Sequence, residues 1–479
     1  MTWQRRYIVK YSVVCPEIQI VSSQEAINRK FRLDPSQYSV ETEKILRCCK
    51  ERRIALKTMK DIGCIEEIYL PNRFSRKYTQ NKNDGVPMIG TSSMLNLKIP
   101  TTDRIYLNNM KDSEELFVKE GDILVSRSGT VGITVLCGSS YEGFVASDHC
   151  FRLRIKKEFR GYIAAYLISR PGQALLAKNS HGKVIKELID EDISNLPVML
   201  FDKATLQELN YKMLDSAKMY DKARKLLNEV EYCLDNVIGY IKPKIVSEVS
   251  KGIVGFTDLI QNRLDPHMYA AEAQYSTKEI VKCNHKYLHE CAYVSGVPRF
   301  KRHYLNENND NGIGLYSSSD IVRAYLTPSK YISKKLNSKN IETCIVEENM
   351  ILIPCSGTFG GILGRGVLAS KILNGQAVSQ HVLRVSQKNS DMNFYYVAAF
   401  LCSDNYGYPL ITARRFGKDI PEISPESLKD IPIPDIDKGE QDKIGALFYE
   451  ANRCQELANS LEAEVISKIE MLFANYVKG

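Results

Sequence analysis

Apolar and polar residues alternate along several short stretches of the chain, and each stretch predicts a β-strand. These stretches are residues 121–126 and 150–155 in the first half, and residues 350–354 and 380–385 in the second half. Continuous apolar runs at residues 161–167 and 394–401 follow the later strands and predict short buried helices. Each half of the chain is therefore expected to form an α/β domain.

Two longer segments carry apolar or small residues three and four positions apart, which is the heptad spacing of paired helices. The first extends from Leu206 to Ile241, and no Pro or Gly interrupts it before Ile238. The second extends from Ile444 to Val465, beyond which the spacing slips by one residue. Small residues at the predicted contact positions favour close packing of the two helices: Ser216, Ala223, Ala451 and Ala458. We predict an antiparallel coiled coil; the alternative is two amphipathic helices, each packed only on its own domain.

The two halves of the chain carry the same motifs in the same order, separated by 226 to 235 residues. The matching motifs are Arg32-Leu33-Asp34-Pro35 and Arg263-Leu264-Asp265-Pro266, Arg73-Phe74 and Arg299-Phe300, Ser128-Gly129-Thr130 and Ser356-Gly357-Thr358, and Gly182-Lys183 and Gly417-Lys418. Because the separation drifts only slightly, the differences indicate loop insertions in one duplicated architecture. The chain is expected to be a pseudo-dimer.

Composition limits the class of protein. A chain of 479 residues exceeds what one core usually holds, and 44% hydrophobic with 25% charged residues is typical of a globular protein. No apolar run approaches the roughly 18 to 20 residues of a membrane span, and the N-terminus lacks the order of a signal peptide. Thirteen cysteines without a Cys-x-x-Cys pair favour reduced thiols. We expect a cytoplasmic protein with no membrane partner.

The net charge of +8 fits solvated lysines as well as a nucleic-acid ligand, but the placement of the cations favours DNA. Basic and aromatic residues alternate at matching places of the two copies: Arg73, Arg76, Lys77 and Tyr78, and then Arg299, Lys301, Arg302 and Tyr304. Such stretches supply phosphate contacts and apolar base contacts together. Double-stranded DNA is the ligand that they predict.

Further DNA-binding candidates lie in the shared motifs and before the long helices. They are Arg127, Ser128 and Thr130 with Ser356 and Thr358 in the turns, Arg152 and Arg384 on the later strands, Lys183 and Lys186, and Arg414, Arg415 and Lys418. The Ser-Gly-Thr turns offer hydroxyls and backbone N–H groups that suit a phosphate oxygen, or that only cap the turn. A solvated surface explains the basic residues before the helices equally well.

Patterns typical of enzymes and metal sites are weak. Cys283, His285, His289 and Cys291 have zinc-like spacing, but the first copy has no Cys or His at that place. The sequence contains neither a phosphate-binding Gly-x4-Gly-Lys-Ser/Thr loop nor an Asn-Pro-Pro-Tyr-type methylation motif. We expect no metal, no cofactor and no catalytic residue.

The order domain, helix, domain, helix, together with the strand-to-turn motif at residues 121–132, resembles the specificity subunit of type I restriction-modification systems. The resemblance implies two target-recognition domains held apart by paired helices, which dock two methyltransferase subunits. A restriction subunit would join for cleavage. The second copy departs from the pattern, because Asn349-Met350 replaces Gly121-Asp122 and Cys355 replaces Arg127. A role for Arg127 therefore does not carry over to Cys355.

These observations divide the chain into six segments. They are an N-terminal extension (1–29), a first recognition domain (30–198), a first spacer helix (199–241), a linker (242–261), a second recognition domain (262–433) and a second spacer helix (434–479). Because the two domains differ in sequence, we expect an asymmetric bipartite DNA target.

Two other functions remain open at this point. The chain could be the recognition end of a single-chain restriction-methylation enzyme, or a structural adaptor whose rods and globular domains bind proteins. The enzyme would need the methylation motif that is missing here. The adaptor would show no DNA affinity that falls as salt rises.

Overall fold

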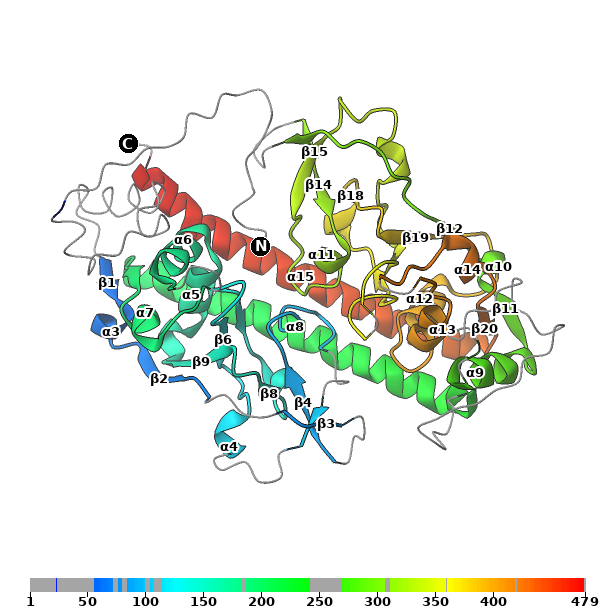
Figure 1. Ribbon diagram of the computed structural model, residues 1–479, viewed down its shortest axis with the longest axis horizontal. Coiled ribbons are helices and arrows are strands. Elements are labelled where there is room, and N and C mark those ends of the chain that lie inside the picture. Colours follow the sequence, from blue (N-terminus) through cyan, green and yellow to red (C-terminus); the bar gives the residue numbers. More distant parts are fainter. Residues whose placement is uncertain are drawn as a thin grey trace. The chain divides into compact units, whose positions relative to one another are not determined.

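The computed structural model describes residues 56–71, 76–79, 84–99, 104–106, 113–181, 186–241, 271–305, 311–358, 360–417 and 420–477, with the single positions 23 and 269. The chain divides into two compact units (Figure 1). Unit 1 comprises residues 1–221 and 457–479, and unit 2 comprises residues 222–456. Each unit thus combines one α/β domain with part of each of two long helices, α8 (Lys203–Ile238) and α15 (Lys438–Val477).

The domain of unit 1 is built on a four-stranded antiparallel sheet of order β2-β9-β6-β7. Its strands are β2 (Ile65–Tyr69), β9 (Cys150–Ile155), β6 (Ile123–Ser126) and β7 (Thr134–Leu136). A second sheet has the order β3-β5-β4-β8, and a third pairs β1 with β10. These strands are β3 (Tyr78–Thr79), β5 (Arg104–Ile105), β4 (Val86–Ile89), β8 (Val145–Ala146), β1 (Leu56–Thr58) and β10 (Pro197–Met199). The helices are α3 (Met59–Ile62), α4 (Ser113–Leu116), η2 (Ser139–Tyr141), α5 (Lys157–Ile168), α6 (Arg170–Asn179) and α7 (Asp190–Ser194).

The domain of unit 2 repeats this topology strand for strand. Its sheets have the orders β12-β19-β16-β17, β13-β15-β14-β18 and β11-β20. The strands are β12 (Ala292–Ser295), β19 (Val382–Gln387), β16 (Ile351–Pro354), β17 (Val367–Leu368), β13 (Tyr304–Leu305), β15 (Lys330–Ser333), β14 (Gly312–Tyr316), β18 (Ala377–Val378), β11 (His285–Tyr287) and β20 (Pro432–Pro434). The duplication predicted from the motifs is confirmed.

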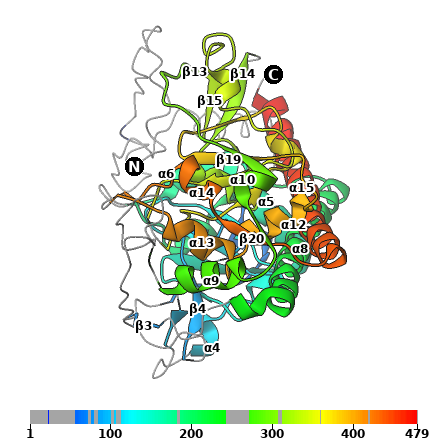
Figure 2. The same ribbon diagram turned by 90° about the vertical axis from the view of Figure 1, so that its right-hand side faces the viewer.

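The helices of unit 2 repeat part of the order of unit 1. They are α9 (Ala271–Val281), α10 (Leu288–Cys291), α11 (Ser318–Ile321), η7 (Ile341–Thr343), η8 (Lys371–Leu373), α12 (Phe394–Leu401), α13 (Gly407–Ala413) and α14 (Pro425–Lys429), with the 3-10 turn η3 (Gly239–Ile241) after α8. Helices α12, α13 and α14 precede β20 as α5, α6 and α7 precede β10, whereas α9 and α11 have no counterpart among the described residues of unit 1. Helices α12 and α13 contact each other, and both are labelled in the two views (Figures 1 and 2). All the described residues of α12 except Tyr395 are buried, as the apolar run predicts. Among the described residues, no helix has the length and apolar character to cross a membrane.

One backbone position shows how the two copies tolerate a sequence difference. Gly121 has a φ of +87°, and the residue at the same place in the second copy, Asn349, has a φ of +68°. Asn is the side chain that best tolerates this left-handed conformation after Gly, because its short amide adapts to the turn. The replacement of Gly121 by Asn349 therefore preserves the turn before β6 and β16.

The long helices complete the core of each unit. In unit 1, Leu209 and Met213 of α8 and Val465 and Ile469 of α15 belong to the same apolar cluster as the buried face of α5. In unit 2, the cluster includes, from the helices, Val230, Leu234, Ile238, Ile444 and Phe448. Burial of such side chains contributes about 1.5–3 kcal/mol each. The helices are therefore part of both domains and not only a connection.

Within each unit the two helices run antiparallel. In unit 1, the Ser216 hydroxyl donates to the Ala458 carbonyl at 2.9 Å, and Lys468 pairs with Glu208 at 2.6 Å. In unit 2, Lys222 pairs with Glu450 at 2.9 Å. The small residues predicted at the contact are buried. The predicted antiparallel pairing is confirmed, and the alternative of two separate helices is wrong.

Both long helices begin after an aspartate. The Asp202 carboxylate accepts from the backbone N–H of Thr205 at 3.0 Å, and the Asp437 carboxylate accepts from that of Gly439 at 2.9 Å. Such caps satisfy backbone donors that the first turn leaves unpaired. The predicted limits of the two domains, at residues 30 and 262, lie outside the described residues.

A buried carboxyl group lies inside the helix pair of unit 1. Glu462 is 5% exposed and accepts a hydrogen bond from the Tyr220 hydroxyl at 3.0 Å. Burial raises the pKa of Glu462 from 4.5 to about 7, although the bond from Tyr220 acts in the opposite direction. The carboxyl therefore favours its protonated form in the folded protein.

We predict that this carboxyl makes the protein less stable as pH rises from about 4.5 to about 7. The unfolded chain releases the proton near 4.5 while the folded chain keeps it, so the free energy of unfolding falls across that window, by about 3 kcal/mol in total. Urea unfolding at several pH values should show that Glu462→Gln removes this slope. The control Glu464→Gln, at a carboxyl that is 54% exposed, should leave the slope unchanged. An unaltered slope in Glu462→Gln would contradict the assignment.

Candidate nucleic-acid interface

An exposed tyrosine occupies the same edge strand in both domains. Tyr78 of β3 lies opposite Ile105 of β5, and Tyr304 of β13 lies opposite Ile332 of β15. The two tyrosines are 57% and 44% exposed. Because the register is identical, the aromatic–basic stretches found in the sequence occupy equivalent places in the fold. Arg73, at the start of the first stretch, lies outside the described residues.

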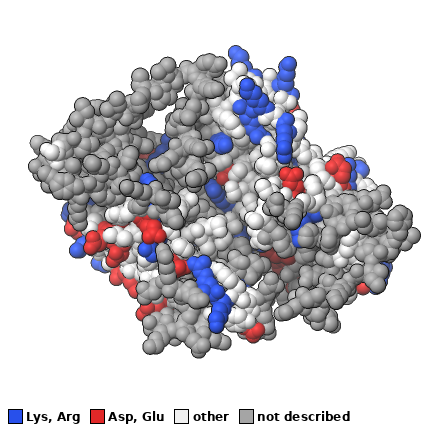
Figure 3. Space-filling model, viewed as in Figure 1, with Lys and Arg blue, Asp and Glu red and all other residues white. Residues whose placement is uncertain are grey.

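One cation lies over this tyrosine in unit 2, and other exposed cations occur on or near the same sheet. The Nζ atom of Lys330 lies 5.1 Å from the centre of the Tyr304 ring, a cation–π distance. The other basic residues exposed on this sheet or next to it are Arg299, Lys301, Lys334 and Lys335. Figure 3 shows Lys and Arg side chains gathered over the part of unit 2 where β14 and β15 lie. Positive charge and an exposed aromatic ring therefore occur together on this sheet.

The arginine two residues before the tyrosine has different surroundings in the two copies. Arg76 forms an ion pair with Asp148, and Lys77 beside it is exposed. Arg302 lies over the Phe300 ring, 5.1 Å from its centre. Arg299 is 78% exposed and reaches Glu422 only at 3.9 Å.

The Ser-Gly-Thr turn of unit 1 is joined to two other segments. The hydroxyl of Ser128 lies 2.6 Å from Nδ1 of His149, and Arg127 pairs with Glu187 at 3.4 Å. Ser128 also forms a β-bridge with Glu187. Thr130 is exposed, and Gly129 holds a φ of +77°. Arg127 and Ser128 therefore have structural partners in this turn, whereas Thr130 is exposed to solvent.

The turn of unit 2 repeats the backbone contacts without the arginine. The N–H of Cys355 donates to the carbonyl of His381 at 2.9 Å, as the N–H of Arg127 donates to that of His149 at 2.7 Å. Ser356 forms the matching bridge to Glu422, and Thr358 is exposed. Cys355 is buried, and burial raises the pKa of its thiol to about 12, so it stays neutral.

Burial of Arg152 inside its domain argues against the predicted contact with DNA. Arg152 is 1% exposed, donates to the Phe117 carbonyl at 3.3 Å and lies 4.3 Å from the centre of the Tyr69 ring. Burial lowers its pKa. Its counterpart Arg384 is half-buried and donates to the Ile345 carbonyl at 2.6 Å, and burial lowers its pKa as well. Both arginines connect β9 or β19 to a neighbouring loop inside the domain.

Burial also argues against the predicted DNA contact of Arg414. Arg414 is 5% exposed and donates to the carbonyls of Leu410 at 2.7 Å and Asp430 at 3.2 Å, so it caps the end of α13. Arg415 is half-buried and donates to the Thr412 carbonyl at 2.8 Å. Lys186 is half-buried, whereas Lys183 and Lys418 lie outside the described residues.

The cysteines and histidines with zinc-like spacing are engaged in other contacts. The ring of Tyr287 lies between those of His285 and His289, at 5.2 Å and 5.9 Å between centres. Cys291 is buried against Met392, with 3.4 Å between the sulfur atoms. No group of three or more His, Cys, Asp or Glu residues suited to a metal occurs in the described part of the chain.

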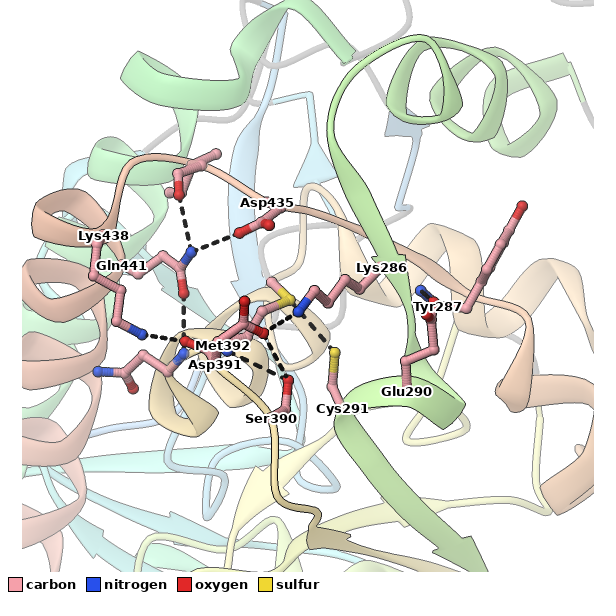
Figure 4. A network of polar contacts seen from close by, with 12 residues as sticks. Lys286, Tyr287, Glu290, Cys291, Ser390, Asp391, Met392, Asp435, Lys438 and Gln441 are labelled. Carbon is pink, nitrogen blue, oxygen red and sulfur yellow. Dashed lines mark hydrogen bonds and ion pairs between the residues drawn. The ribbon is translucent and has the colours of Figure 1, made fainter.

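The same segment belongs to a polar network that holds the start of α15 (Figure 4). Lys286 forms an ion pair with Asp391, and the amine of Lys438 donates to the Asp391 carbonyl. Gln441 accepts from the N–H of Asn393 at 3.0 Å and donates to the carbonyl of Ile436 at 2.9 Å. The segment from β11 to α10 therefore has a structural role in unit 2.

The family model for the type I restriction modification DNA specificity domain matches the chain twice, at residues 55–232 and 288–466. The chain belongs to this family. Each match begins near the first described strand of one domain and extends into the long helix that follows it. The chain is therefore a DNA specificity subunit with two repeats of the specificity domain. No curated protein matches it.

Three solved structures are similar to the chain. The type I restriction-modification S subunit from M. genitalium has 11% identity, with 88% of this chain and 95% of that chain covered and a TM-score of 0.29. The HsdS subunit from Thermoanaerobacter tengcongensis has 13% identity, coverage of 89% and 96%, and a TM-score of 0.27. A chain from a study of complex assembly and conformational transition of the type I R-M system has 12% identity, coverage of 88% and 96%, and a TM-score of 0.28.

We predict that Arg152→Ala destabilises the protein without changing its contact with DNA. Removal of this buried side chain leaves a cavity and leaves the Phe117 carbonyl without its donor, at a cost of about 2 to 4 kcal/mol. Thermal unfolding measures the loss, and a salt titration of duplex binding at a temperature where the variant is folded should give the wild-type slope. Thr130→Ala, at an exposed position, is the stability control. A normal melting temperature with a lower salt slope would show that Arg152 faces DNA.

Proposed function

We propose that each α/β domain of this specificity subunit binds one half of a bipartite duplex DNA target through its small sheet, β3-β5-β4-β8 or β13-β15-β14-β18. The observation that carries the proposal is the repeated exposed tyrosine, Tyr78 or Tyr304, in the same register of both sheets. Around Tyr304, lysines provide the positive charge that phosphates require, and the ring offers a flat apolar face.

The two half-sites are proposed to differ. Equivalent positions near the Ser-Gly-Thr turns carry different side chains, as with Arg127 and Cys355, while their backbone contacts are the same. Base recognition depends on the donors and acceptors that side chains present in the groove. Domains with one backbone and different side chains should therefore select different bases, which gives an asymmetric target.

The helix pair is proposed to set the distance between the half-sites. Helix α8 has 36 residues, which corresponds to about 54 Å at ~1.5 Å per residue. This length is a little more than one and a half turns of duplex at ~34 Å per turn. Because both domains include helix residues in their cores, the helices can hold them at a fixed separation.

Catalysis is proposed to belong to partner chains. The match to the specificity family supports two methyltransferase subunits and a restriction subunit as partners. In unit 1 the helix pair exposes apolar side chains on its outer surface, namely Tyr211, Leu457 and Met471. We propose that this subunit supplies recognition and that the methylated adenine is handled by its partners.

We predict that Lys301→Ala with Lys330→Ala weakens binding to duplex DNA. Loss of two phosphate-contacting cations should reduce the slope of log affinity against log salt by about 1.8, since each contact contributes about 0.9. Fluorescence anisotropy with a labelled duplex at several salt concentrations measures the slope. Lys282→Ala, at an exposed lysine of the same unit that pairs with Glu279, should keep the wild-type slope.

Two results would contradict the proposal in different ways. A wild-type slope in the double variant would remove the β13-β15-β14-β18 sheet from the interface. Absence of duplex binding by the wild-type chain at low salt would favour the structural adaptor instead.

A further inference from the structure

The two copies differ in whether the second arginine of the basic stretch, Arg76 or Arg302, is neutralised. Arg76 and Arg302 each stand two residues before the tyrosine on β3 or β13. Asp148 and Gln380 each stand two residues after the end of β8 or β18. The residue directly after each strand makes the same backbone hydrogen bond. The N–H of Ser147 donates to the Ile89 carbonyl at 3.0 Å, and the N–H of Ser379 donates to the Tyr316 carbonyl at 2.9 Å. Arg76 with Asp148 therefore corresponds to Arg302 with Gln380.

In the first copy a carboxylate forms an ion pair with the arginine. Arg76 donates to Asp148, whose side chain is only 7% exposed. Ion pairs between a guanidinium and a shielded carboxylate are stronger than those on an open surface, because water screens them less. A DNA phosphate that approaches Arg76 must compete with a fixed negative charge. The positive charge of Arg76 is thus largely cancelled before DNA arrives.

In the second copy, among the residues that the structure describes, the neutral Gln380 stands where the first copy has Asp148. The amide of Gln380 lies 3.3 Å from Nε2 of His381. Two nitrogens of Arg302, Nε and Nη2, are buried and have no hydrogen-bond partner in the part of the chain that the structure describes. A guanidinium with unmade hydrogen bonds gains them when it meets an anion, and its planar fork matches a phosphate.

We propose that the residue at position 148 or 380 determines how much its domain contributes to phosphate binding. Asp148 holds Arg76 in the free protein and makes the first domain the weaker electrostatic partner. Gln380 does not neutralise Arg302, so Arg302 moves away from the Phe300 ring when DNA binds and contacts a phosphate of the duplex. This inference rests on the proposed DNA contact of the small sheets.

A substitution at position 380 tests the inference. Gln380→Asp recreates in the second copy the carboxylate of the first, and should weaken binding to a random-sequence duplex roughly tenfold at low salt. The slope of log affinity against log salt should fall by about 0.9, the share of one phosphate contact. Gln380→Asn keeps the position neutral and should bind as the wild type does. Gln387→Asp places the same charge on an exposed residue of β19 and is the matched control.

Further variants separate an electrostatic role of Arg302 from a packing role. Arg302→Met keeps a long apolar side chain beside Phe300 and should lower the salt slope by the same amount, with little change in melting temperature. Adding Gln380→Asp to Arg302→Met should have no further effect, because the charge that it neutralises is gone. Asp148→Asn should act in the opposite direction and tighten binding, since it frees Arg76.

The outcomes are distinguishable. If Gln380→Asp binds like Gln387→Asp, or if its effect persists in full when Arg302 is absent, the inference is overturned while the DNA contact itself stands. If Arg302→Met changes only the melting temperature, Arg302 has a packing role and the inference also fails. If the wild-type chain binds no duplex at low salt, the proposed function fails, and this inference with it.

Discussion

The fold depends on the close approach of two antiparallel helices that belong to both domain cores. Ser216 and Ala458 are small enough for the backbones to meet, and the Ser216 hydroxyl bonds directly to the facing helix in unit 1. Leu209, Val465 and their neighbours then cover the apolar side of the first domain, as Leu234 and Ile444 do for the second. Each α/β domain completes its core with side chains of both helices, so the apolar burial of each domain depends on the helices.

The duplicated domains preserve backbone geometry while their charged side chains diverge together. In unit 1, Arg154 of β9 pairs with Glu67 and with Asp122. At the corresponding positions of unit 2 stand Ser386, Tyr293 and Met350, so a whole charged group is replaced by neutral residues. The same occurs around the turns, where Arg127 becomes Cys355. Apolar patterning and backbone hydrogen bonds maintain the fold, and this leaves polar side chains free to change specificity.

Much of the fold could be predicted from the sequence, because periodicity and repetition are local properties. Heptad spacing identified α8 and α15, and the repeated motifs identified two copies of one topology. The individual DNA contacts were harder to predict from the sequence. Alternation along β9 places Arg152 on one face of the strand but does not reveal that this face points into the domain. The burial of Arg414 also has no local signal, because its acceptors include a carbonyl 16 residues away. The pairing of Arg76 with Asp148 spans 72 residues and leaves no local signal.

The central claim is that paired helices hold two unlike DNA-binding domains at a fixed separation. The most direct test maps the methylated adenines in DNA from a host that carries this subunit and its methyltransferase partners. The account predicts two short half-sites of different sequence, separated by a constant number of unspecified base pairs. A single continuous site, two identical half-sites, or half-sites at variable spacing would contradict it.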